Sequence, residues 1–212
     1  MLIAEAVTAG YRTPVVRQVD LQLAPGEIVG ITGESGSGKT TLARVLAGLR
    51  APSAGRVTVD GKPPNRARGS IAMVFQSPRA ATNPQFTLAE IITEPARIRR
   101  TPIPDLTALI TSVGLTPDLL DRRPHALSDG QLQRACLARA LTQHPRYLIL
   151  DEATAMLDAA TTATIITLVR THHHLGVLLI SHDRPLLDVT CHRIATMHEG
   201  TLTTEDTATS PG

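Results

Sequence analysis

The feature that most limits what this chain can fold into is a glycine-rich loop between an apolar run and a helical stretch. The run Glu27–Thr32 is short and apolar, as expected of a strand that is buried on both faces. Residues 33–40 match the pattern G-x-x-x-x-G-K-[ST] in full. The apolar spacing of Thr41–Leu49 predicts a helix immediately afterwards. Strand, glycine-rich loop and helix in this order predict a phosphate-binding loop in an α/β domain.

The chemistry of this loop is that of anion binding. Glycines let it curl until several backbone N–H groups point inward, and the positive end of the following helix adds to their field. We expect Lys39 to place a positive charge beside the β- and γ-phosphates and the Thr40 hydroxyl to bind Mg²⁺. A glycine-rich turn with a chance lysine is the alternative, which the flanking strand and helix disfavour. The predicted nucleotide contacts are Gly33, Glu34, Ser35, Gly36, Ser37, Gly38, Lys39, Thr40 and Thr41.

A second motif places two carboxylates at the end of another apolar run. Tyr147–Leu150 predicts a buried strand, and Asp151 and Glu152 follow it directly. The carboxyl ends of strands are where open α/β sheets bind ligands. We expect Asp151 to hold Mg²⁺ through water and Glu152 to act as the general base toward an attacking water. In isolation the motif would be an ordinary acidic turn; beside a phosphate-binding loop it indicates hydrolysis.

Strand and helix predictions alternate along much of the chain, which indicates a parallel sheet. Arg56–Val59, before Asp60-Gly61, resembles one arm of a hairpin. Prolines concentrate from residue 77 to residue 143, and we expect an inserted helical subdomain there, between core segments 1–76 and 144–212. The polar residues 203–212 are expected to be loose. Further strands are predicted at Leu2–Val7, Val19–Leu23, Ile71–Phe75, Val177–Ile180 and Ile194–Met197, and a helix at Thr161–Arg170.

Composition excludes several function classes. The 212 residues suit one domain, and a formal net charge of +2 predicts neither nucleic-acid nor membrane binding. Only 2% of the residues are aromatic, which disfavours a base-stacking surface. Cys136 and Cys191 lack metal-binding spacing and suit reduced thiols. Neither a membrane-spanning stretch nor a signal peptide is recognisable, so we expect a cytoplasmic chain that reaches membranes through partners.

Further motifs give the chain a family resemblance over nearly its whole length. Leu127–Gln131 resembles the LSGGQ signature of the nucleotide-binding subunits of ABC transporters, and residues 132–141 resemble its helix. The resemblance implies a P-loop NTPase (RecA-like) α/β core with a mainly parallel sheet, an N-terminal antiparallel β region and an inserted helical subdomain. It also assigns the Q-loop to Gln76, the D-loop to Ala155–Asp158, the H-switch to Ser181–Asp183 and the adenine-stacking aromatic to Tyr11.

The resemblance implies that two subunits enclose two ATP molecules with Mg²⁺. Ser128, Gly130 and Gln131 would then bind the γ-phosphate held by the opposite subunit's loop. A hydroxyl and backbone N–H groups before a helix suit this task, because helix N-termini attract anions. Gln76 would bind Mg²⁺ and assist catalysis, and His182 would hydrogen-bond the γ-phosphate or the attacking water. A strand-end histidine alone is more often structural, but the Ser-His-Asp context favours the functional role.

One position departs from the family pattern, because Asp129 stands where the signature has glycine. A carboxylate near a γ-phosphate is electrostatically unfavourable unless it points away. One hypothesis is a weaker composite site, which would make the two sites of a heterodimer unequal. The alternative, which we favour, is that the side chain faces solvent and changes nothing.

The inserted helical region and the residues just before it resemble the peptide/nickel importer ATPases. The matching positions are 73–78, 83–84, 87, 91–95 and 122–128. This implies an ATPase on the cytoplasmic face of the plasma membrane, with permease subunits, a second ATPase subunit (identical or paralogous) and, indirectly, an extracytoplasmic solute-binding protein. Many oligopeptide members of this group carry a C-terminal extension past the last strand. We expect this chain to lack it, which favours nickel or a metallophore as the solute and leaves peptides open. No nucleic-acid partner is expected.

The sequence disfavours two other functions. A soluble ABC ATPase of DNA repair or translation would need tandem modules or a long coiled-coil insertion, yet only about fifty residues separate Gln76 from Ser128. A pseudo-ATPase would lack catalytic residues that this chain retains. Two basic clusters are read as solvated surface, His172–His174 at a helix end and the arginines at 97, 99 and 100.

Overall fold

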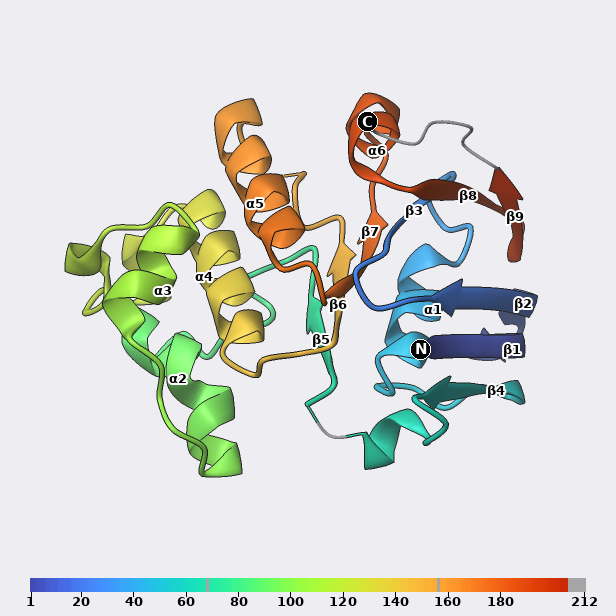
Figure 1. Cartoon of the computed structure of the whole chain (residues 1–212), viewed down its shortest axis with the longest axis horizontal. Helices are drawn as coiled ribbons and strands as arrows, with labels where there is room; N and C mark the ends of the chain where they lie inside the picture. The colour runs from blue at the N-terminus through green and yellow to red at the C-terminus, as the bar shows by residue number, and fades with distance from the viewer. Residues whose placement is uncertain (68, 156, 206–212) are drawn as a thin grey trace.

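Two β-sheets and a group of helices make up the computed structural model, which describes residues 1–67, 69–155 and 157–205 (Figure 1). An antiparallel sheet has the order β2-β1-β4, from Pro14–Leu23, Leu2–Gly10 and Ala54–Val59. The larger sheet has the order β5-β6-β7-β3-β8-β9, from Ile71–Val74, Tyr147–Asp151, Gly176–Ile180, Ile28–Thr32, Arg193–His198 and Thr201–Glu205. Its first five strands are parallel, and β9 pairs antiparallel with β8.

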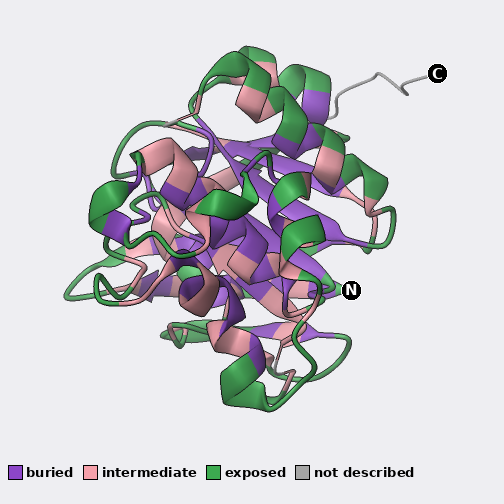
Figure 2. Ribbon diagram, turned by 90° about the vertical axis from the view of Figure 1, so that its left-hand side faces the viewer, coloured by how far each residue is buried: buried purple, intermediate pink, exposed green. Residues whose placement is uncertain are grey.

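Helix α1 (Lys39–Leu46) lies between the two sheets and contacts β1, β2 and β6. Its residues Leu42 and Leu46 are fully buried, in one hydrophobic cluster with both sheets. Strands β6 and β7 are buried along their whole length, as apolar runs without alternation predict. Figure 2 shows buried strands through the middle of the molecule. The carboxyl ends of the parallel strands β3 and β6 therefore lie on the same edge of the sheet, with β7 between them.

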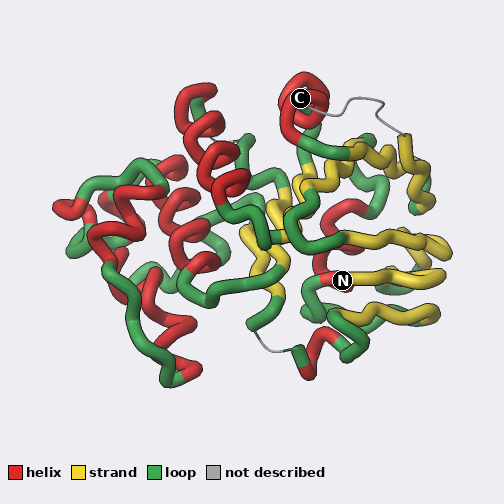
Figure 3. Tube along the Cα trace, in the orientation of Figure 1, coloured by secondary structure: helices red, strands yellow, loops and turns green. Residues whose placement is uncertain are grey.

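The helices α2 (Leu88–Arg99), α3 (Leu106–Ser112) and α4 (Asp129–Leu141) follow β5 and precede β6. They gather at the end of the molecule opposite the antiparallel sheet (Figures 1 and 3). Helices α2 and α4 pack together through buried residues that include Ile92 and Leu132. Capping boxes at Thr87 and Ser128 define where α2 and α4 begin. Helices α5 (Ala159–Thr171) and α6 (Arg184–Thr190) follow β6 and β7.

The α/β architecture confirms the predicted fold class, including the antiparallel N-terminal region and the helices inserted between strands. Two local predictions were wrong. Residues 203–205 are the end of β9, whose ladder with β8 outweighs their polar character. Asp60-Gly61 turns the chain, but among the described residues the only bridge across this turn joins Val59 to Lys62. Strand β4 pairs with β1 instead of forming a hairpin. The predicted loose residues 206–212 lie outside the described residues. None of the described helices is long and apolar enough to cross a membrane.

Candidate nucleotide site

The glycine-rich loop joins β3 to α1 and depends on glycine at three positions. Gly33, Gly36 and Gly38 all have positive φ, between 81° and 138°. A Cβ on Gly33 would lie 2.1 Å from the carbonyl oxygen of Met197, so the loop is also packed too closely for a side chain. Helix α1 begins after Gly38, which has no side chain to cap it. No capping side chain therefore accepts a hydrogen bond from the first backbone N–H groups of the helix. The buried hydroxyl of Ser37 has no hydrogen-bond partner in the described chain. Unpaired donors around a curled loop fit phosphate oxygens.

Lys39 lies across this loop. Its Nζ donates hydrogen bonds of 2.7 Å to the carbonyl oxygens of Gly33 and Glu34, and the residue is 5% exposed. Burial lowers the pKa of the Lys39 ammonium, while the carboxylates of Glu152 and Asp151 act in the opposite direction. A phosphate group bound here would offer the ammonium charged acceptors in place of two carbonyls, which strengthens its hydrogen bonds.

The end of β6 meets the start of α1 through Thr40 and Asp151. The Thr40 hydroxyl donates to Oδ1 of Asp151 at 3.1 Å, and Asp151 is only 2% exposed. Burial raises the pKa of Asp151, whereas the hydrogen bond from Thr40 acts in the opposite direction. One hydroxyl and one carboxylate held together supply the oxygen ligands that Mg²⁺ prefers alongside phosphates and waters.

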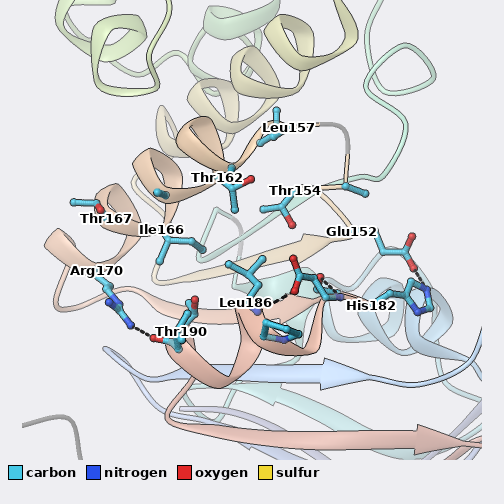
Figure 4. Close-up of a pocket in the computed structure, with 17 residues that line it drawn as sticks. Glu152, Thr154, Leu157, Thr162, Ile166, Thr167, Arg170, His182, Leu186 and Thr190 are labelled. Carbon is cyan, nitrogen blue, oxygen red and sulfur yellow. Dashed lines mark hydrogen bonds and ion pairs between the residues drawn. The ribbon is translucent and has the colours of Figure 1, made fainter.

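Glu152 is held between two side chains from distant parts of the sequence. Its Oε2 accepts a hydrogen bond of 2.6 Å from Nε2 of Gln76, and its Oε1 lies 2.7 Å from Nε2 of His182. Figure 4 shows the carboxylate and the imidazole turned toward each other. Glu152 also has a φ of 51°, a left-handed conformation that is strained for a side-chain-bearing residue and often found at functional sites. The structure thus brings together all three predicted catalytic residues.

One hollow of about 370 Å³ collects most of the predicted site. Its volume lies within the range typical of small-molecule pockets. Tyr11 stands at its margin with 80% exposure, and the guanidinium of Arg50 lies 3.8 Å from the centre of its ring. Sequence reasoning missed Arg50, since nothing in its spacing indicates a contact with Tyr11. The lining residues are Tyr11, Val15, Ser35, Gly36, Gly38, Lys39, Thr40, Thr41, Gln76, Glu152 and His182.

The signature residues do not line that hollow; they begin helix α4. The Ser128 hydroxyl accepts a hydrogen bond from the Gln131 backbone at 3.1 Å, and Oε1 of Gln131 accepts one from the Ser128 backbone. The hydroxyl proton of Ser128 stays available for an acceptor. The carboxylate of Asp129 is 46% exposed, and it pairs with Arg79 at 2.6 Å. Sequence reasoning missed Arg79, which belongs to no recognisable motif.

The predicted D-loop is described only in part, because Met156 lies outside the described residues. Asp158 caps α5 by accepting from the backbone N–H of Thr161, which lowers the pKa of its carboxyl. Beside this segment, a hollow of about 850 Å³ opens between α5 and α6 and shares Glu152 and His182 with the nucleotide pocket (Figure 4). The three histidines 172–174 follow α5, with His173 and His174 exposed.

Comparisons with known proteins agree with this geometry. The profile of the ABC transporter family matches residues 16–155. The nickel import ATP-binding protein NikE of Rhodospirillum rubrum is 37% identical, over 97% of this chain and 83% of its own. The ATP-binding cassette MJ0796, solved as a dimer in a post-hydrolysis state with ADP and Pi, superposes with a TM-score of 0.90 at 25% identity, covering 99% of this chain and 100% of its own. For cbiO1 from Clostridium perfringens, part of the transporter complex cbiONQ, the TM-score is 0.79 at 26% identity, covering 97% and 88%.

Proposed function

Because this chain belongs to the ABC transporter family, we propose that it is the ATP-hydrolysing subunit of an importer for nickel, metal–chelator complexes or peptides. The observation that carries the ATPase assignment is the convergence of Lys39, Thr40 and Glu152 on one pocket, with the buried Asp151 hydrogen-bonded to Thr40 behind it. The importer assignment is supported by relatives named as nickel import ATP-binding proteins, which are 37–41% identical to this chain. None of these relatives supports the alternative function, a soluble ABC ATPase of DNA repair or translation.

Nucleotide binding would use the loop from residue 33 to residue 41. Its backbone N–H groups and Lys39 would hold the β- and γ-phosphates, and the exposed ring of Tyr11 would stack on the base. Thr40, Asp151 and Gln76 are the residues proposed to hold Mg²⁺, which when bound would offset part of the negative charge on the phosphate oxygens. The 3.1 Å contact between Thr40 and Asp151 already brings two of these oxygens together.

Hydrolysis would proceed by attack of water on the γ-phosphorus. The water oxygen forms the new bond, the bond from the γ-phosphorus to the β–γ bridging oxygen breaks, and Glu152 accepts the proton of the water. Gln76 and His182 contact both oxygens of that carboxylate and would orient it, and His182 would also hydrogen-bond the γ-phosphate or the water. These roles position the reactants, which is most of what phosphoryl-transfer enzymes do.

The proposed assembly contains a second ATPase subunit and membrane permeases. Ser128, Gly130 and Gln131 start α4 outside the pocket of their own chain, which suits contact with the nucleotide of a partner subunit. The dimeric state of MJ0796 and the membership of cbiO1 in a transporter complex support this arrangement. Residues 77–143 would pass motion to the permeases at the cytoplasmic face of the plasma membrane. A solute-binding protein would act on the opposite face.

The test is recovery of the complex from its own membranes. Tagged protein is purified from detergent-solubilised membranes, and its partners are identified by mass spectrometry. We expect integral-membrane permeases together with an ATPase subunit, and a co-purifying binding protein would separate metal complexes from peptides as solute. Recovery of soluble partners alone, while a control transporter from the same preparation stays intact, would refute the transport function.

A further inference from the structure

The segment that follows Gln76 is fastened to the signature helix. Gln133 donates from Nε2 to the carbonyl oxygen of Phe75 at 3.0 Å, and Arg139 donates from Nη1 to that of Ala81 at 2.8 Å. In the sequence, Arg79 lies between the two fastened residues, Phe75 and Ala81. These contacts place residues 75–81 along most of the length of α4.

Arg79 uses three of its nitrogens on the chain just before and at the start of α4. Nε donates to Oδ1 of Asp129 at 2.6 Å, Nη1 to the carbonyl oxygen of Pro124 at 3.0 Å, and Nη2 to that of Leu127 at 3.1 Å. A planar guanidinium with three acceptors has a fixed orientation, which lysine cannot reproduce. Arg79 therefore fixes both the direction of the Asp129 carboxylate and the backbone that leads into Ser128.

This contact removes the electrostatic conflict at the third signature position. An uncompensated carboxylate there would repel a polyphosphate, and repulsion at short range is strong where water is excluded. Paired with a guanidinium, the group is neutral as a unit and turned toward residues 124–127. The neighbouring Ser128 hydroxyl and the Gly130 backbone N–H can then face an anion, whereas the Gly130 carbonyl oxygen accepts from Arg134.

We propose that Arg79 is a positioning residue that makes Asp129 compatible with the signature, by holding its carboxylate away from the γ-phosphate of the ATP bound to the partner subunit. The inference rests on the proposed function. Its specific consequence is coupling: Arg79 matters for turnover because Asp129 is present. An arginine with a purely structural role would matter equally with glycine at that position.

The test is a double-mutant cycle in the purified transporter, with this chain, its permeases and its second ATPase subunit. R79A, D129G and the double variant are compared by their kcat and KM for ATP. R79K tests whether the planar guanidinium, with its several donors, is required. An exposed ion pair contributes little to folding, so R79A is expected to fold. The matched control is R56A, which removes another exposed arginine–carboxylate pair, with Glu5, on the antiparallel sheet.

We expect R79A to lower kcat/KM about tenfold, and to lower it less than about twofold in the D129G background. R79K should lie between R79A and the unaltered chain. Binding of a fluorescent ATP analogue to the chain's own loop should be unchanged, because Arg79 does not line that pocket. The proposal would be overturned if R79A lowered kcat/KM equally with Asp129 and with glycine at position 129, or lowered it in neither case. An unaltered transporter without ATPase activity would instead refute the proposed function.

Discussion

Nε2 of Gln76 lies 2.6 Å from Oε2 of Glu152, although 76 positions separate them in the chain. The other carboxylate oxygen of Glu152 is 2.7 Å from Nε2 of His182. Glu152 is therefore oriented from both sides by residues that follow β5 and β7, the two neighbours of its own strand. Movement of the segment after Gln76 would reach the carboxylate directly.

Replacing Lys39 with alanine should weaken Mg-ATP binding about 100-fold, because a buried charge-assisted contact to phosphate is lost. Equilibrium binding of a fluorescent ATP analogue measures this. The control is Lys62→Ala, since Lys62 is the other lysine of the sequence and is exposed at a turn. Equal affinities of the Lys39 variant and the control would remove the phosphate role of the loop.

Glu152→Gln should lower the rate of hydrolysis at least about 100-fold, because the amide cannot accept the proton of the water. Nucleotide binding should persist, and an ATP-bound dimer should accumulate in sedimentation experiments. Glu199→Gln, at an exposed carboxylate, serves as the control. Normal turnover of the Glu152 variant would show that another group is the base.

Thr40→Val and Asp151→Asn should each raise the Mg²⁺ concentration needed for half-maximal ATP hydrolysis, since the first removes a hydroxyl oxygen and the second removes the carboxylate charge of the proposed site. Thr40→Ser keeps the hydroxyl and should retain most of the effect of Mg²⁺. Titration of the ATPase rate with Mg²⁺ separates the three variants. A Val variant that responds to Mg²⁺ as the Ser variant does would exclude Thr40 as a ligand.

Tyr11→Ala should weaken ATP binding about tenfold, as expected when a base loses a stacking partner. Arg50 lies over one face of the ring, and the high exposure of Tyr11 leaves the ring accessible to a base. Tyr11→Phe keeps the ring and should bind nearly as the unaltered chain. Calorimetry on both variants decides, and equal losses would point to the hydroxyl instead of the ring.

Asp60 predicts a pH dependence of stability. The hydrogen bond and charge of the Met1 amine, the charge of Arg146 and a hydrogen bond from Tyr147 lower the pKa of its carboxyl. A depressed pKa adds stability above the unfolded-state value, near pH 4, and this gain is lost as the pH falls through the folded-state value. Asp60→Asn should therefore lower the unfolding free energy by about 1 kcal/mol at pH 7.

Urea unfolding at pH 7 and at pH 3 measures this effect. The difference between Asp60→Asn and the unaltered chain should be smaller at pH 3 than at pH 7, because the carboxyl of the unfolded chain binds a proton below about pH 4. Asp118→Asn, at an exposed carboxylate in the helical region, is the control. A difference that is the same at both pH values would mean that the carboxylate charge does not stabilise the fold.

The local sequence determined the parts of the site whose chemistry is contiguous. Residues 33–40 specify a glycine-dependent turn and a following helix, and the apolar residues before Asp151 specify a buried strand with acidic residues at its end. Both motifs can be predicted from the sequence because the conformational freedom of glycine, the backbone N–H groups of a turn and a short apolar run each depend on a few consecutive residues. The ladder that holds residues 203–205 in β9 is not visible in this way, because an edge strand depends on its neighbour and not on its own polarity.

Tertiary structure alone decided which of these parts meet. Insertion of β7 between β3 and β6 sets the distance at which Thr40 reaches Asp151, and the flanking strands bring Gln76 and His182 to the two oxygens of Glu152. The pair of Arg79 and Asp129 is of the same kind: sequence identified an unusual carboxylate, and only packing of residues 75–81 on α4 supplied its counter-ion. Strand order and helix packing depend on which residues far apart in the sequence are buried together. The local spacing of residues does not determine this.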